Sequence, residues 1–154
     1  MKAVIQRVTN ASVTVDRTVL GECNQGFMIL FGAVEGDTLC DVELLAQKTV
    51  NLRIFCDEND KMNKSILDID GEILAISQFT LAADVKKGNR PSFIKALEPN
   101  LAEQYYDLFC DKLKELGVKR VEKGVFGGDM KVSLINDGPV TILYDTEIWR
   151  KNGN

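Results

Sequence analysis

The sequence predicts an α+β domain whose sheet is mainly antiparallel. Apolar runs of strand length outnumber helical patterns, they follow one another closely, and only two stretches have helical spacing. Consecutive strand clusters are typical of α+β domains, whereas strands that alternate with helices form parallel sheets. The length of 154 residues favours one domain over 1–154, in which we expect a frayed tail at 147–154.

The first part of the chain predicts a β-meander. Residues 2–8 alternate apolar and polar side chains, and residues 11–15 continue this pattern. A turn at 16–17 leads into the next strand, and the apolar run 26–34 has the length of a buried strand.

Two segments predict helices. The first runs from the capping pair 37–38 to about Asn51. The second runs from about Pro99 to Leu116, where Gly117 can adopt the left-handed conformation that ends a helix.

The remaining strands are expected in the second half of the chain. One covers 72–82, and a charged loop follows at 83–93. Three more are expected at 119–127, 131–137 and 140–148. Pro139 separates the last two because proline cannot donate a ladder hydrogen bond.

Composition excludes several kinds of catalytic site. The chain has no histidine, which removes Ser-His-Asp and Cys-His arrangements and every zinc site that contains histidine. Its net charge of −4 is unlike the basic charge of a nonspecific nucleic-acid binder, so a nucleic-acid partner would require a local basic patch.

Nothing in the sequence points to export or to a membrane. No apolar run approaches the roughly 18 residues of a membrane span, and the first residues lack the apolar core of a secretory signal. The four cysteines lack CxxC spacing and favour buried free thiols. We therefore expect a cytoplasmic protein with no membrane partner, no metal and no cofactor.

The stretch SQFTL is the first that could carry chemistry. Ser77 and Thr80 supply hydroxyls, and Gln78 supplies an amide. If the strand ends here, the N–H groups of Phe79 and Thr80 can form an oxyanion hole. The alternative is an ordinary strand end with local hydrogen bonds.

The stretch NDGPVT contains the Gly138-Pro139 pair. A trans peptide bond there would simply begin an edge strand. A cis bond would direct two carbonyls outward on a rigid bend, which could serve as a wedge or a polar clamp on a ligand.

Two further stretches are KKGNRPSF and FGGDM. Lys86, Lys87 and Arg90 could hold phosphates or could belong to a solvated loop, and three cations of segment 119–123 could add to the positive surface. Phe126 and Met130 could line a pocket, although composition favours a place in the core.

After an opening MKAVIQRV, these four stretches in this order resemble the D-aminoacyl-tRNA deacylase family, also called D-tyrosyl-tRNA deacylase, from Met1 to about Asp145. The resemblance implies a β-barrel-like sheet with two main flanking helices, and a homodimer whose active site lies at the subunit interface. The implied reaction is hydrolysis of the ester that joins a D-amino acid, or glycine mischarged on a non-cognate tRNA, to the tRNA 3′ end. This is a proofreading step of translation.

For this reaction, the residues of SQFTL predict the catalytic roles. The Phe79 N–H, with that of Thr80, would hold the oxyanion, while Ser77 and Gln78 orient the ribose and the carbonyl. A covalent role for the Thr80 hydroxyl is the second alternative.

Substrate-binding roles follow from the resemblance. Gly138-Pro139 would reach the site of the other subunit and exclude L-aminoacyl groups, with Arg7 as a brace for its carbonyls. Ala102 would line the adenine side. The remaining implied contacts are the pocket residues Phe126 and Met130 and the tRNA-phosphate contacts Lys86, Lys87 and Arg90.

Two alternative functions remain open at this point. One is a noncatalytic dimeric module that binds the tRNA end. The other is a relaxed deacylase with a trans Gly138-Pro139 bond that accepts L-amino acids.

Overall fold

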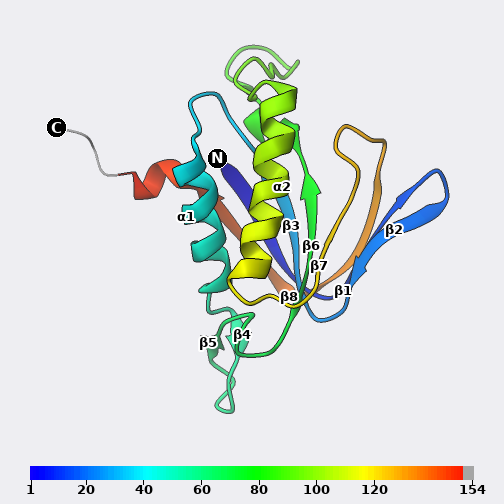
Figure 1. Ribbon diagram of the computed structural model, residues 1–154, viewed down its shortest axis with the longest axis vertical. Coiled ribbons are helices and arrows are strands. Elements are labelled where there is room, and N and C mark those ends of the chain that lie inside the picture. The colour runs from blue at the N-terminus through cyan, green and yellow to red at the C-terminus, as the bar shows by residue number, and fades with distance from the viewer. Residues whose placement is uncertain (151–154) are drawn as a thin grey trace.

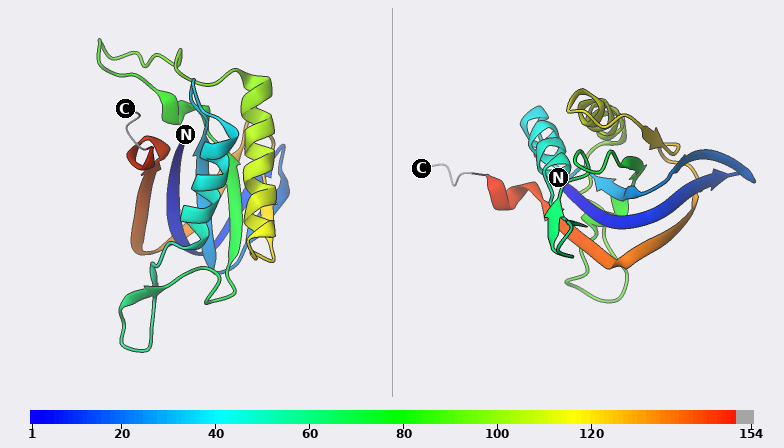
Figure 2. Two further views of the ribbon diagram at one scale, coloured as in Figure 1. Left: turned by 60° about the vertical axis from the view of Figure 1, so that its left-hand side comes forward. Right: turned by 90° about the horizontal axis from the view of Figure 1, so that it is seen from below.

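The computed structural model describes residues 1–150, and a strongly curved sheet carries both helices on one face (Figures 1 and 2). The strands are β1 (Lys2–Val15), β2 (Thr18–Cys23), β3 (Gly26–Gly32), β4 (Phe55–Cys56), β5 (Met62–Lys64), β6 (Glu72–Ser77), β7 (Val121–Lys123) and β8 (Lys131–Asp145). The helices are α1 (Leu39–Val50) and α2 (Pro99–Glu115), with 3₁₀ turns η1 (Phe79–Ala82) and η2 (Thr146–Trp149). Within this part of the chain, neither helix is long and apolar enough to cross a membrane.

The long strand β1 organises the sheet. Its first half pairs with β3, its second half with β2, and β8 runs antiparallel along almost its whole length. The strand order is β2-β1-β3-β6-β7, with β8 on β1, and the curvature gives a nearly closed barrel. The predicted barrel-like α+β fold is confirmed. The β3–β6 and β6–β7 pairs are parallel because α1 and α2 lie in the crossovers between these strands.

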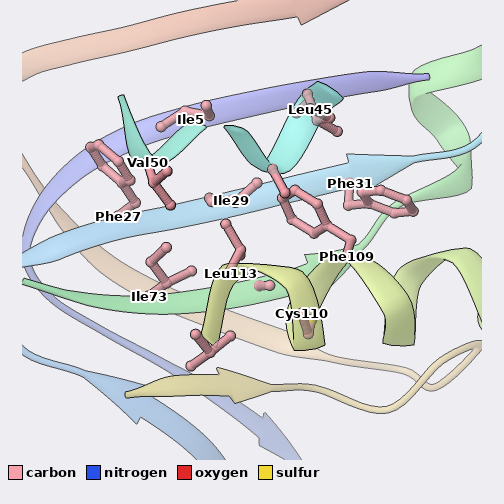
Figure 3. Packing of buried hydrophobic residues seen from close by; sticks show 14 of the residues in the cluster. Ile5, Phe27, Ile29, Phe31, Leu45, Val50, Ile73, Phe109, Cys110 and Leu113 are labelled. Carbon is pink, nitrogen blue, oxygen red and sulfur yellow. The ribbon is translucent and has the colours of Figure 1, made fainter. Parts of the chain in front are cut away.

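The main core lies between the sheet and the two helices. Ile5 and Phe31 of the sheet face Leu45, Phe109 and Leu113 of the helices (Figure 3). The Phe31 and Phe109 rings stack with centroids 5.0 Å apart. A second cluster, which includes Val13, Met28 and Leu74, fills the curled part of the sheet. β6 contributes to the second cluster and α2 to the main core, so both elements that flank the segment 78–98 are held by packing.

An ion pair fastens the start of the chain to the turn before α1. The α-ammonium of Met1 lies 2.6 Å from Asp37 Oδ1, and both groups are fully buried. Thr146 Oγ1 accepts a second hydrogen bond from this ammonium, at 3.0 Å. The Arg150 guanidinium lies 2.9 Å from the same Asp37 oxygen. The pair therefore joins β1, the start of α1 and the end of β8.

Several local predictions were wrong. β3 pairs with β1 rather than with β2, so the first three strands do not form the expected meander. The two strands expected at 131–137 and 140–148 are one strand, β8, which ends at Asp145, and the strand expected at 119–127 covers only Val121–Lys123. The strand expected over 72–82 ends at Ser77, because the chain leaves the ladder there and forms η1. The tail expected to fray was 147–154, but Thr146–Trp149 form η2, since Asp145 caps this turn and the Trp149 ring packs edge-on against Tyr144. The end of the predicted tail, 151–154, lies outside the described residues.

The four cysteines are free thiols, but only Cys23 and Cys110 are buried. Burial raises the pKa of Cys23 to about 11 and that of Cys110 to about 12. Because the thiolate is the reactive form, we expect iodoacetamide at about pH 8 to modify only Cys40 and Cys56 in the native protein. Intact mass spectrometry should show two adducts before denaturation and four after it. Rapid native labelling of four thiols would contradict the packing described here.

Candidate active site

A pocket of about 680 Å³ opens beside the end of β6. Six of the predicted site residues line it: Ser77, Gln78, Phe79, Ala102, Phe126 and Met130. They come from β6, η1, α2 and the loop before β8, so the fold brings together segments about 50 residues apart. Phe126 also packs against the main core and Met130 against the second cluster, so both serve as core and as lining.

The backbone at the end of β6 leaves two donors free. The Gln78 N–H makes the last bond to β3, to the Phe31 carbonyl at 2.7 Å. Phe79 and Thr80 then occupy the first two positions of η1, where N–H groups have no partner within the turn. Within residues 1–150, neither N–H donates a hydrogen bond to another backbone group. A negatively charged oxygen bound here would meet two adjacent donors.

The polar side chains at this point contact one another. The Gln78 side-chain amide donates to Thr80 Oγ1 at 2.5 Å. Thr80 itself is absent from the pocket lining, and its hydroxyl oxygen is engaged as the acceptor of this bond. The Phe79 ring is 58% exposed and meets Phe93 edge-to-face, with centroids 5.2 Å apart. These two rings form an apolar rim.

Gly32 is a residue of the site that the sequence prediction missed. A Cβ atom at this position would lie 2.9 Å from the Gln78 carbonyl oxygen and 3.0 Å from Leu81 Cβ. Only glycine lets the backbone of η1 lie so close to the end of β3. The signal in the sequence was a glycine at the end of a continuous apolar run.

The Gly138-Pro139 pair lies in a bulge of β8. Val8 pairs with Asn136 and Gln6 pairs with Thr141, so Arg7 alone faces the four residues 137–140. β8 bends sharply along its length (Figure 2, right). The Gly138-Pro139 peptide bond is cis, and both residues are exposed. Neither lines the pocket beside β6 of its own chain.

Arg7 binds the base of this bulge. Its Nε donates to the Asp137 carbonyl at 2.8 Å, and a terminal nitrogen donates to the Ile54 carbonyl at 2.7 Å. Gly138 has φ +141°, and a Cβ there would lie 2.7 Å from Val140 Cγ2 and 3.1 Å from the guanidinium. The bulge therefore needs glycine both for its backbone angle and for its contact with Arg7.

The predicted phosphate contacts lie on an exposed loop next to the pocket. Lys86, Lys87 and Arg90 project from a loop whose ends join through the Asp84–Ser92 bridge. The hydrogen bond from the Lys86 N–H lowers the pKa of Asp84, with Lys95 as a further cause. No carboxylate in residues 1–150 forms an ion pair with these three cations.

The second group of cations does not extend the positive surface as expected. Lys119 pairs with Asp70 at 3.2 Å, and Lys123 pairs with Asp107 at 3.0 Å. Arg120 lies within 4 Å of three glutamates, Glu22, Glu72 and Glu122. These carboxylates offset the charge, which leaves the 86–90 loop as the unpaired basic segment.

Residues 4–145 match the model of the family described as D-Tyr-tRNA(Tyr) deacylase. The chain belongs to this family. A D-aminoacyl-tRNA deacylase from Roseiflexus sp. (strain RS-1) is 52% identical over 154 residues, which cover all of this chain and 99% of the relative. As a member of the D-Tyr-tRNA(Tyr) deacylase family, the protein is an enzyme that hydrolyses D-aminoacyl-tRNA.

Two solved structures share the fold. One is titled "c-Myc DNA Unwinding Element Binding Protein"; it is 42% identical, with a TM-score of 0.89, over 94% of this chain and 98% of that one. The other is a probable eukaryotic D-amino acid tRNA deacylase, 17% identical with a TM-score of 0.78, over 93% of this chain and 97% of that one. The predicted family and enzyme class of this chain are confirmed.

Proposed function

We propose that this deacylase hydrolyses the ester in the pocket beside β6 and that the two free N–H groups of η1 stabilise the oxyanion. This arrangement of donors, next to Ser77 and Gln78 in a largely apolar pocket, is the observation that carries the proposal. Donors fixed in advance at the place where charge develops supply a large share of the rate of acyl transfer.

In this mechanism water attacks the ester carbonyl while the amino acid is still attached to the 3′-terminal ribose. The carbonyl oxygen becomes an oxyanion between the N–H groups of Phe79 and Thr80. Ser77 and Gln78 orient the ribose and the carbonyl, and the neighbouring ribose 2′-OH positions the water. The C–O bond then breaks, and the ribose oxygen leaves with the proton that the attacking water gives up, so that the products are the free amino acid and the tRNA 3′-hydroxyl. Ala102, Phe126 and Met130 line the binding surface around these groups.

The active form is a homodimer in which each pocket receives Gly138-Pro139 from the other subunit. Both residues are exposed and lie outside the pocket of their own chain, as this model requires. The outer face of the sheet offers an apolar row for the contact, because Leu143 pairs with Val4 and Val4 with Leu30. Leu143 is 75% exposed. Burying such a row would stabilise a dimer.

Chirality follows from where the substrate amino group is held. The Gly138 carbonyl accepts a hydrogen bond from the α-ammonium, while the ester remains at the oxyanion donors. With these two points fixed, a D side chain points to open space and an L side chain points into protein. Glycine has no side chain, so glycyl-tRNA is also a substrate. Rejection by backbone atoms lets many different D side chains enter.

The acceptor end of tRNA is held by its phosphates. Lys86, Lys87 and Arg90 are exposed, lie on the loop that follows η1, and have no ion-pair partner in residues 1–150. Charge contacts of this kind fix position without reading base sequence. The enzyme therefore works where charged tRNA is used, in the cytoplasm.

The decisive test compares three substrates with the purified chain: D-Tyr-tRNA, L-Tyr-tRNA and Gly-tRNA. Release of amino acid from the D-Tyr and Gly esters, but not from the L-Tyr ester, is expected. Release from L-Tyr-tRNA alone would indicate a relaxed L-accepting enzyme, and release from none would indicate a noncatalytic tRNA-end binder. Sedimentation should show a dimer, and a monomer of full activity would exclude the shared site.

Thr80 tests whether a side chain or the backbone performs the chemistry. The Thr80→Ala variant keeps the backbone N–H and loses only the hydrogen bond from Gln78. We expect kcat for D-Tyr-tRNA to fall by no more than about fivefold, the value of one neutral hydrogen bond. A loss of several orders of magnitude in single-turnover kinetics would instead establish the hydroxyl as the nucleophile.

A further inference from the structure

The bulge of β8 is closed at its neck by one side chain. Asn136 is the last residue paired with β1 before the bulge, and Thr141 is the first after it. Asn136 Oδ1 accepts a hydrogen bond from the Val140 N–H at 2.7 Å. Asn136 Nδ2 donates to Thr141 Oγ1 at 3.0 Å. The side chain therefore joins the strand before the bulge to the strand after it.

These bonds satisfy groups that the bulge removes from the ladder. Val140 has no partner on β1 and is buried, so its N–H would be costly to leave unpaired. Gln6 on β1 also donates to Thr141 Oγ1, at 3.4 Å. Arg7 binds the carbonyl of Asp137, the first residue of the bulge, whereas Asn136 binds the N–H of Val140, its last residue. Gly138 and Pro139 lie between these two anchored residues.

We propose that Asn136 is a positioning residue for stereoselectivity, which acts by fixing the direction in which the Gly138 carbonyl leaves the sheet. This inference rests on the proposed function, in which that carbonyl binds the substrate α-ammonium. If the hydrogen bonds of Asn136 are lost, the Gly138 carbonyl moves away from the substrate amino group. The bulge then leaves room for an L side chain that it otherwise blocks. A displacement of about 1 Å can cost about 100-fold in rate. Asn136 therefore controls the ratio of D to L hydrolysis.

The test measures kcat/KM for D-Tyr-tRNA and L-Tyr-tRNA, with a thermal melt for each full-length variant. Asn136→Ala removes both bonds and should lower the D-to-L ratio by at least about tenfold. Asn136→Asp should restore most of the ratio, because it keeps the acceptor for Val140 and can accept the Thr141 hydroxyl proton. Thr141→Val removes the second bond together with the longer bond from Gln6, keeps the bond from Val140, and should give a ratio between those of the other two variants.

Asn10→Ala is the matched control. Asn10 is an exposed asparagine of β1 that pairs with Ile135, just before the bulge, and within residues 1–150 its side chain hydrogen-bonds only to Thr9. The D-to-L ratio of kcat/KM for Asn10→Ala should equal that of the wild type.

A folded Asn136→Ala protein with a lower melting temperature but a wild-type ratio would overturn the inference, because it would show a purely structural role. If Asn136→Ala does not fold, an unchanged ratio for Thr141→Val overturns it. A wild-type protein that hydrolyses neither ester overturns the proposed function as well. If the wild-type protein is active and the variants keep its D-to-L ratio, only this inference is overturned.

Discussion

Replacing Asp37 with asparagine is expected to lower the free energy of unfolding by about 3–5 kcal/mol, the usual cost of removing one partner of a buried ion pair. The carboxylate is fully buried 2.6 Å from the Met1 ammonium, and it also binds Arg150. Asparagine can still accept the hydrogen bond from the Val34 N–H but cannot neutralise the ammonium. Chemical denaturation monitored by circular dichroism measures the loss.

Asp111→Asn is the control for this experiment. Asp111 lies on α2, is exposed, and forms no ion pair within residues 1–150. A surface substitution of this kind should change stability by no more than about 0.5 kcal/mol. Equal stability of the two variants would show that the buried pair contributes no net stability.

Replacing Arg7 with alanine is expected to lower kcat/KM for D-Tyr-tRNA by about 100-fold, the cost of a displacement of about 1 Å at a reacting group. The guanidinium makes two divergent hydrogen bonds, to the carbonyls of Asp137 and Ile54. Without them, on the proposed mechanism, the Gly138 carbonyl loses its fixed position relative to the substrate α-ammonium. Hydrolysis of L-Tyr-tRNA should rise relative to D-Tyr-tRNA, and single-turnover assays with both esters measure the change.

Two variants control the Arg7 experiment. Arg7→Lys keeps the charge but cannot make both bonds with one ammonium, so most of the loss should remain. Arg17→Ala removes an exposed arginine of the β1–β2 turn whose side chain forms no hydrogen bond or ion pair within residues 1–150, and it should leave turnover unchanged. Full activity in Arg7→Ala would mean that the bulge holds its shape without this side chain.

Local patterns in the sequence were sufficient to predict both helices and most strands. α1 and α2 begin and end within about two residues of the predicted bounds, because Thr38, Pro99 and Gly117 carry direct terminal signals. The strand predicted at 72–82 was too long since the apolar pattern continues through η1. Backbone direction there is set by contact with Gly32, which periodicity does not reveal.

The residue patterns gave the site as separate stretches, the family resemblance implied which residues belong to it, and the fold brings six of them together. Nothing in the local sequence of Ala102 or Phe126 places it beside Ser77, because the parallel β6–β7 pair and the packing of α2 bring these segments together. The four-against-one bulge opposite Arg7 depends on strand register, which the sequence does not specify. The pairing of Lys119, Arg120 and Lys123 with acidic residues was missed for the same reason.

The hydrogen bond from Arg7 to the Ile54 carbonyl connects the β4–β5 hairpin to the bulge that contains Gly138 and Pro139. The tip of this hairpin, around Asp57, makes its recorded hydrogen bonds within the hairpin, so it should tolerate an inserted tag or fluorophore. The root of the hairpin, at Ile54, is different, because a shift of Ile54 would displace the Arg7 guanidinium, which also binds the Asp137 carbonyl. On the proposed mechanism, sequence changes at the root therefore alter which mirror image the enzyme accepts, without altering any atom that touches the substrate.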